Sequence, residues 1–192
     1  MTRTRRIVAT LVATTALAVP TTLTMSTAEA KPSATKTVKS QAKQLLKDVA
    51  REDRQLVRLA GSHRVTGLAD ATEAALVANL TEARSTLAEV EAAVEAADST
   101  VDTKAARKEL RSFRVQNFKH AAHVLVKVED LTGDAAADPE AQAFLAQAAA
   151  AALAVTATST KAEVKAAKAH LASATAELEG AESDDEVVTP TV

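Results

Sequence analysis

The chain has 192 residues, with 23 basic and 25 acidic side chains and no cysteine. Alanine makes up about a quarter of it, far above ordinary usage, while glycine and proline number four each. This composition favours helix throughout and excludes disulfide bonds, a lipid-anchored cysteine and catalysis by a cysteine nucleophile. We therefore predict an all-α protein, built as an antiparallel helical bundle of three to four long helices.

Residues 1–30 have the layout of a cleavable secretory signal peptide. A basic start precedes a short apolar run over residues 7–19, and Ala28 and Ala30 supply the small residues that a signal peptidase reads. The apolar run is too short to span a bilayer as a stable helix. We expect cleavage after Ala30 and a secreted, extracytoplasmic protein. Arg5 and Arg6 faintly resemble a twin-arginine signal, so the export route stays open between the two systems.

Export would change the charge of the chain. Residues 1–30 hold three arginines and one glutamate, so 20 basic and 24 acidic residues remain, giving a net charge of −4 without Met, Trp or Tyr. An acidic, exported chain argues against a nucleic-acid partner, and we interpret the basic run Lys161, Lys165 and Lys168 as a solvated helix face. The rest of the sequence contains no second apolar span, so we predict no transmembrane segment.

Residues 31–36 are predicted to be a flexible lead-in, followed by a bundle domain over residues 37–180. The first helix of this domain is expected over residues 37–60. Glu52 falls on its apolar stripe, which is made of Val38, Ala42, Leu45, Val49, Leu56 and Leu59. We expect Glu52 to reach solvent or to pair with a base on the next helix. The alternative is a buried carboxylate that serves a site.

A second helix is expected from residues 68–70 to residue 97, after a connection bounded by Gly61 and Gly67. Its opposite surface is acidic. Its apolar residues repeat in a heptad-like stripe of Leu76, Leu80, Ala83, Leu87, Val90, Val94 and Ala97.

The central helix is predicted over residues 100–131, because this stretch holds two of the three phenylalanines and the densest large apolar side chains. Gly133 is expected to end it in a left-handed conformation. Its apolar face would be formed by Leu110, Phe113, Phe118, Ala121, Leu125 and Val128.

The last helix is expected to begin at Asp138-Pro139 and to run to Leu178, with Gly180 ending it. Residues 156–160 are its weak point, because Ser and Thr compete for backbone hydrogen bonds. Thr160 and Glu163 have the spacing of a capping box. Two helices are thus an open alternative, although the alanine content favours one. Residues 181–192 are predicted to be a disordered acidic tail.

Few residues point to chemistry, and we predict no catalytic residue and no cofactor. His120 and His123 lie three residues apart on one helix face, with Asp130 on roughly the same side. These two histidines are weak metal candidates, since imidazole nitrogens bind Zn or Cu. His63 and His170 would join them only if tertiary packing brought them near.

The segment Arg111–Phe118, RSFRVQNF, carries a resemblance. The layout resembles uncharacterised exported, alanine-rich helical proteins of bacteria, which combine a signal peptide with three or four helices. The resemblance implies the fold and the export, and it implies no activity or site residue. Asn117 and His120 are predicted to form a buried polar pair that fixes helix register.

These observations predict an exported, non-enzymatic helical bundle that acts as a binding or structural protein of the cell envelope or extracellular space. The alternative is an amphipathic protein that works on a lipid or hydrophobic surface. A third hypothesis is a metal-binding bundle centred on His120 and His123. Homo-oligomerisation stays open.

Overall fold

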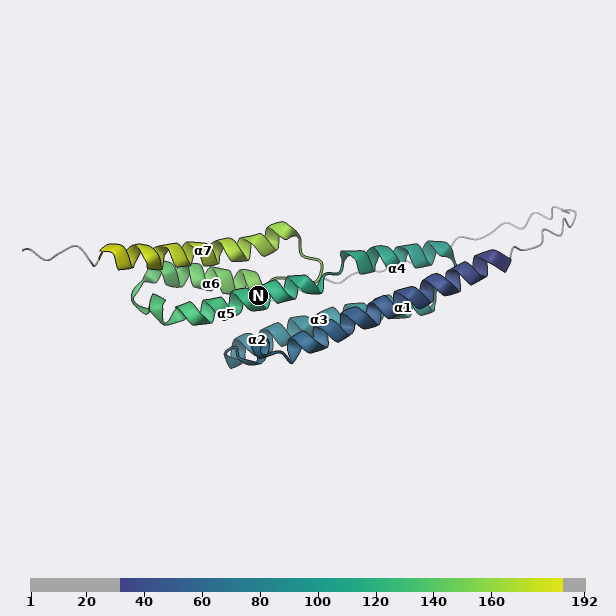
Figure 1. Ribbon diagram of the computed structural model, residues 1–192, viewed down its shortest axis with the longest axis horizontal. Coiled ribbons are helices and arrows are strands. Elements are labelled where there is room, and N and C mark those ends of the chain that lie inside the picture. Colours follow the sequence, from purple (N-terminus) through teal and green to yellow (C-terminus); the bar gives the residue numbers. More distant parts are fainter. Residues whose placement is uncertain (1–31, 185–192) are drawn as a thin grey trace, which may run out of the picture. The chain divides into compact units, whose positions relative to one another are not determined.

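The computed structural model describes residues 32–184 (Figure 1). The predicted signal peptide and the tail beyond Asp184 lie outside these residues. Within them the chain forms helices and no strand, which confirms the all-α bundle. The elements are α1 (Pro32–Ala60), α2 (His63–Thr66), α3 (Asp70–Glu95), α4 (Thr100–Ser112), α5 (Val115–Thr132), the 3-10 turn η1 (Asp134–Ala137), α6 (Pro139–Leu153) and α7 (Lys161–Asp184).

Helices α1 and α3 pack along each other, and their predicted apolar stripes form the contact. Leu56, Leu76 and Leu80 are almost completely buried there. Helix α1 begins at Pro32, five residues before the predicted helix start at residue 37. Helix α3 ends two residues before the predicted Ala97.

The connection between α1 and α3 contains the short helix α2, where a loop was expected. Its Val65 is fully buried and anchors it to the core. Gly67 follows it, and a Cβ at this position would lie 2.8 Å from the carbonyl oxygen of His63. The close approach of the two backbones therefore requires glycine at residue 67.

The predicted central helix is interrupted, because Phe113 adopts extended backbone angles (φ −75°, ψ 125°) and separates α4 from α5. Helix α4 begins with a capping box in which the Ser99 and Asp102 side chains each bond the other's backbone N–H. Helix α4 packs on α1 and α3, whereas α5 packs mainly on α6 and α7. One straight helix could not satisfy both sets of neighbours.

The predicted last helix is also interrupted, between Leu153 and Lys161, so the prediction of one helix was wrong. Its predicted capping box is present: the Thr160 backbone N–H donates to Glu163 Oε2 over 2.6 Å, and Thr160 Oγ1 accepts from the Glu163 N–H. Gly133 follows the last residue of α5 as predicted, but its predicted left-handed conformation was wrong, and so was the predicted stop at Gly180. Gly180 lies inside α7, and Gly133 has right-handed angles (φ −66°, ψ −46°) because the chain continues directly into η1.

The two interruptions contact each other. The Arg114 backbone N–H donates to the Ala157 carbonyl over 2.8 Å. The buried Asn117 amide, one turn into α5, donates to three carbonyls of the α6–α7 loop, those of Thr156 (3.1 Å), Ala157 (3.4 Å) and Ser159 (2.9 Å). Each break therefore supplies the hydrogen-bond partners that the other one needs.

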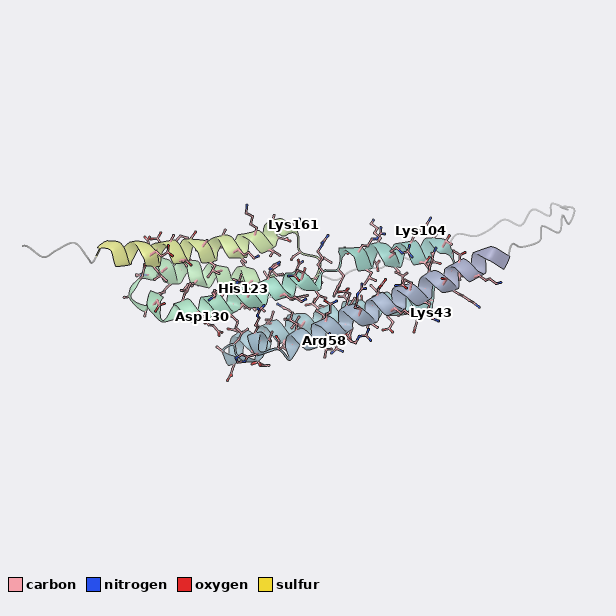
Figure 2. The ribbon with its side chains drawn as sticks, in the orientation of Figure 1. Lys43, Arg58, Lys104, His123, Asp130 and Lys161 are labelled. Atoms are coloured by element: carbon pink, nitrogen blue, oxygen red, sulfur yellow. The ribbon has the colours of Figure 1, made fainter. Side chains whose placement is uncertain are left out.

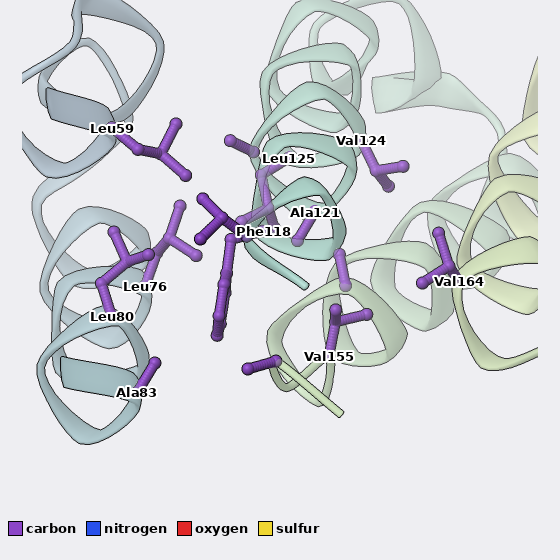
Figure 3. Close-up of a cluster of buried hydrophobic side chains, with 14 of the residues drawn as sticks. Leu59, Leu76, Leu80, Ala83, Phe118, Ala121, Val124, Leu125, Val155 and Val164 are labelled. Carbon is purple, nitrogen blue, oxygen red and sulfur yellow. The ribbon is translucent and has the colours of Figure 1, made fainter. Parts of the chain in front are cut away.

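The core lies on both sides of α5. Phe118 is 1 % exposed and projects from α5 toward Leu76, Leu80 and Ala83 of α3 (Figure 3). On its other side α5 meets α6 and α7, whose contact is rich in alanine. Phe118 is thus the largest fully buried side chain, and it joins α3 to the second half of the chain.

Candidate anion-binding groove

Helix α1 carries a continuous line of basic residues. They recur at three- and four-residue steps, which places them on one face of the helix, opposite the buried apolar stripe. The residues are Lys36, Lys39, Lys43, Lys47, Arg51, Arg54 and Arg58. Figure 2 shows Lys43 and Arg58 along α1 and Lys104 on the adjacent α4.

An open groove of about 760 Å³ lies where the C-terminal half of α1 meets α2 and α5. We call it the basic groove. It is lined by Arg51, Arg54, Gln55, Arg58, Leu59, Ser62, His63, Arg64 and Lys119. Five cationic side chains from three helices therefore line one concavity, and none of the lining residues is a carboxylate.

Most of these cations have no carboxylate partner. Only Arg51 is engaged, through Asp48 and Glu52 of its own helix, both over 3.3 Å. Among the described residues, no ion pair involves Arg54, Arg58, Arg64 or Lys119. Their charges reinforce one another in a concave surface, which concentrates positive potential there.

A second groove, of about 410 Å³, lies between α1 and α4. We call it the α1–α4 groove. It is lined by Gln44, Leu45, Asp48, Arg51, Glu52, Arg107, Leu110 and Arg111. Arg51 lines both grooves, so the two concavities adjoin along α1. The α1–α4 groove contains two carboxylates and three arginines and is therefore less strongly basic.

The residues predicted as metal candidates lie as follows. His120 is partly buried, and its Nδ1 lies 3.3 Å from Lys168 Nζ of α7. Burial lowers the pKa of His120, and the neighbouring Lys168 and His123 lower it further. His123 is exposed, and Asp130 pairs with Lys127 over 3.1 Å. In residues 32–184, no three His, Cys, Asp or Glu side chains come together in a way that could hold a metal ion.

Two other sequence predictions are met only in part. Asn117 is buried as expected, but it bonds the α6–α7 loop, and His120 faces Lys168 instead of joining a buried pair. Glu52 is partly exposed and pairs with Arg51 and Gln55 of its own helix. Arg84 of α3 instead forms an ion pair with Asp53, the residue that follows Glu52, over 2.7 Å.

The basic groove was missed by the sequence reasoning, although part of its signal is visible in the sequence. The three- and four-residue spacing from Lys36 to Arg58 marks a one-sided basic helix. The contributions of Arg64 and Lys119 could not be predicted, because they depend on how α2 and α5 meet α1.

Comparison with known proteins found no match: no family model, no curated protein and no solved structure is similar to this chain. Among the described helices, none combines the length and the apolar character that crossing a membrane requires.

Proposed function

We propose that this chain is an exported, non-enzymatic helical bundle that binds an anionic component of the cell envelope or the extracellular space. The observation that carries this proposal is the basic groove, whose four unpaired cations come from three helices. In a chain with more acidic than basic residues, these cations are concentrated in one concavity.

The side chains of the groove suit anion binding. A guanidinium group donates two parallel hydrogen bonds to a carboxylate or phosphate, and a lysine ammonium adds a mobile point charge. Arg54 and Arg58 lie one turn apart on α1, with Arg64 and Lys119 contributed by α2 and α5. An anion in the groove would therefore be contacted from more than one direction.

The lining supports binding rather than catalysis. No carboxylate is present to act as a general acid or base. The Ser62 hydroxyl donates to the Leu59 carbonyl over 2.7 Å, so it is already engaged in ending α1. Of the remaining polar side chains, His63 is of a type that can act as a general acid or base, and the four unpaired cations outnumber it.

The lipid-surface alternative has less support. Among the described residues, only Val57 and Val101 are large apolar side chains that remain exposed. A folded bundle with this surface offers little apolar area to an acyl layer.

The test is calorimetric titration of the purified chain with tripolyphosphate, in the wild type and in Arg54→Gln/Arg58→Gln. We expect the double variant to bind about tenfold more weakly, because it loses two charge-assisted contacts in an open site. The matched control, Lys161→Gln/Lys165→Gln, removes two exposed charges from α7 and should leave the affinity unchanged.

Salt dependence gives a second readout of the same site. The logarithm of the affinity should fall as the logarithm of the salt concentration rises, because exposed charges are screened. The groove variant should show the shallower slope. Equal affinities for the groove variant and the α7 control would refute the assignment of binding to the groove.

A further inference from the structure

We infer that the ligand is a linear polymer of phosphate groups, which lies lengthwise along α1 from the basic groove, past Arg51, into the α1–α4 groove. This inference rests on the proposed function and names the ligand class of the same site.

The two grooves are continuous along α1. The two grooves share Arg51, and both lie along the side of α1 where it meets the next helices. Their α1 linings extend from Gln44 to Leu59, which is about 22 Å at the helical rise of 1.5 Å per residue. A single small anion would occupy only part of this length.

The cations that line the two grooves come from more than one helix. In the basic groove Arg54 and Arg58 belong to α1, while Lys119 belongs to α5. Farther along, Arg107 and Arg111 of α4 face the same side of α1. Cations therefore lie on two walls of the basic groove and on the α4 wall of the α1–α4 groove, whose α1 wall holds Asp48 and Glu52 beside Arg51.

The geometry of the anion decides between phosphate and carboxylate. A carboxylate has two coplanar oxygens, and a bidentate arginine uses both of them. The unesterified oxygens of a tetrahedral phosphate project in different directions, so one can meet α1 while another meets the opposite wall. The cations on two walls of the basic groove are thus better matched by a polyphosphate chain than by a carboxylate polymer.

Arg51 connects the two grooves and can exchange partners. Its side chain is 60 % exposed, and its contacts to Asp48 and Glu52 are each 3.3 Å long. Ion pairs at this exposure are weak. A phosphate crossing from one groove to the other would compete for the guanidinium, while Gln55 continues to hold Glu52.

The experiment is a length series of inorganic probes: pyrophosphate, tripolyphosphate and long-chain polyphosphate, titrated calorimetrically into the purified chain. Affinity is expressed per phosphate, so that a long chain gains nothing merely by presenting more binding positions. We expect long-chain polyphosphate to bind at least about tenfold more tightly per phosphate than pyrophosphate.

The decisive variant is Arg107→Gln/Arg111→Gln, which alters only the α1–α4 groove. This variant should remove the increase in affinity per phosphate with chain length, and it should leave the affinity for pyrophosphate unchanged. The control is Lys104→Gln/Lys108→Gln, which removes two exposed cations of α4 that line neither groove and should retain the gain.

The outcomes separate the inference from the proposed function. Binding of every probe without a length effect would overturn the inference and leave the anion site standing. Equal affinity for polyglutamate of similar length would overturn the choice of phosphate. Tighter binding to phosphatidylglycerol vesicles than to polyphosphate would identify a lipid surface as the ligand and overturn the inference of a linear polymer. No binding to any probe would overturn both proposals.

Discussion

Replacing Asn117 by alanine should test how the two helix interruptions are held together. Its amide donates to the carbonyls of Thr156, Ala157 and Ser159. Two of these carbonyls keep a second donor: that of Ala157 accepts from the Arg114 N–H, and that of Thr156 from the Ser159 N–H. The Ser159 carbonyl would lose the partner that Asn117 supplies.

The expected loss follows from this count. One partly buried acceptor without a partner costs about 1–3 kcal/mol, and the two shared bonds add a smaller amount because their acceptors stay satisfied. We therefore expect Asn117→Ala to lower the free energy of unfolding by about 2 kcal/mol. For a domain of this size that corresponds to a fall in Tm of roughly 4–8 °C.

Urea unfolding followed by far-ultraviolet circular dichroism measures this loss. The control is Gln116→Ala, an exposed neighbour in the same helix turn, whose effect should stay within about 0.5 kcal/mol. Asn117→Asp keeps the side-chain volume but removes the donor, so it should destabilise at least as much as alanine. An Asn117→Ala variant as stable as the Gln116→Ala control would refute the reasoning.

Two further predictions concern stability. Phe118→Ala should lower the free energy of unfolding by about 3–5 kcal/mol in the same assay, because Phe118 is 1 % exposed between α3 and α5. Phe144 is only partly buried, so Phe144→Ala should lower the free energy of unfolding by clearly less. Equal losses in the two variants would contradict the central role of Phe118. The Ser99 hydroxyl bonds the Asp102 carboxylate and lowers its pKa, so this stabilisation is complete above the ordinary carboxyl pKa and is lost as the pH falls through the lower folded value. Ser99→Ala should therefore lower Tm more at neutral pH than in strong acid, and an equal drop at both would argue against this linkage.

Much of the fold could be predicted from periodicity and capping. The stripe from Leu76 to Val94 located α3 within two residues at its C-terminal end, and Asp138-Pro139 marked the start of α6. These signals are local: they depend on side-chain spacing and on the first turn of a helix.

The interruptions could be predicted only in part. Phe113 and Phe118 are five residues apart, which is not a helical step, and this mismatch coincides with the break between α4 and α5. The break between α6 and α7 had two signals, a Ser/Thr-rich run and the capping box at Thr160. The alanine content favours one continuous helix, and the contacts from Asn117 that stabilise the loop come from far along the chain, so the local sequence gives no signal of them.

The site was the least predictable part. Two histidines three residues apart on a helix are a local metal-site signal, yet His120 and His123 do not meet further metal-binding side chains in the described part of the chain. The arginines of α1 form an ordinary helix face until α2 and α5 add Arg64 and Lys119. A groove of this kind is a tertiary property.

The alanine-rich contact between α6 and α7 affects how the protein opens. Ala141, Ala148, Ala152, Ala167 and Ala174 are buried there, and each contributes only a methyl group, so separating these helices exposes less large apolar surface than separating α1 from α3. Helices α1 and α3 bury leucines instead. Amide hydrogens of α6 and α7 should therefore exchange with solvent through a local opening, while those of α1 and α3 exchange only on global unfolding. The basic groove is lined by α1, α2 and α5, so neither α6 nor α7 supplies any of its side chains.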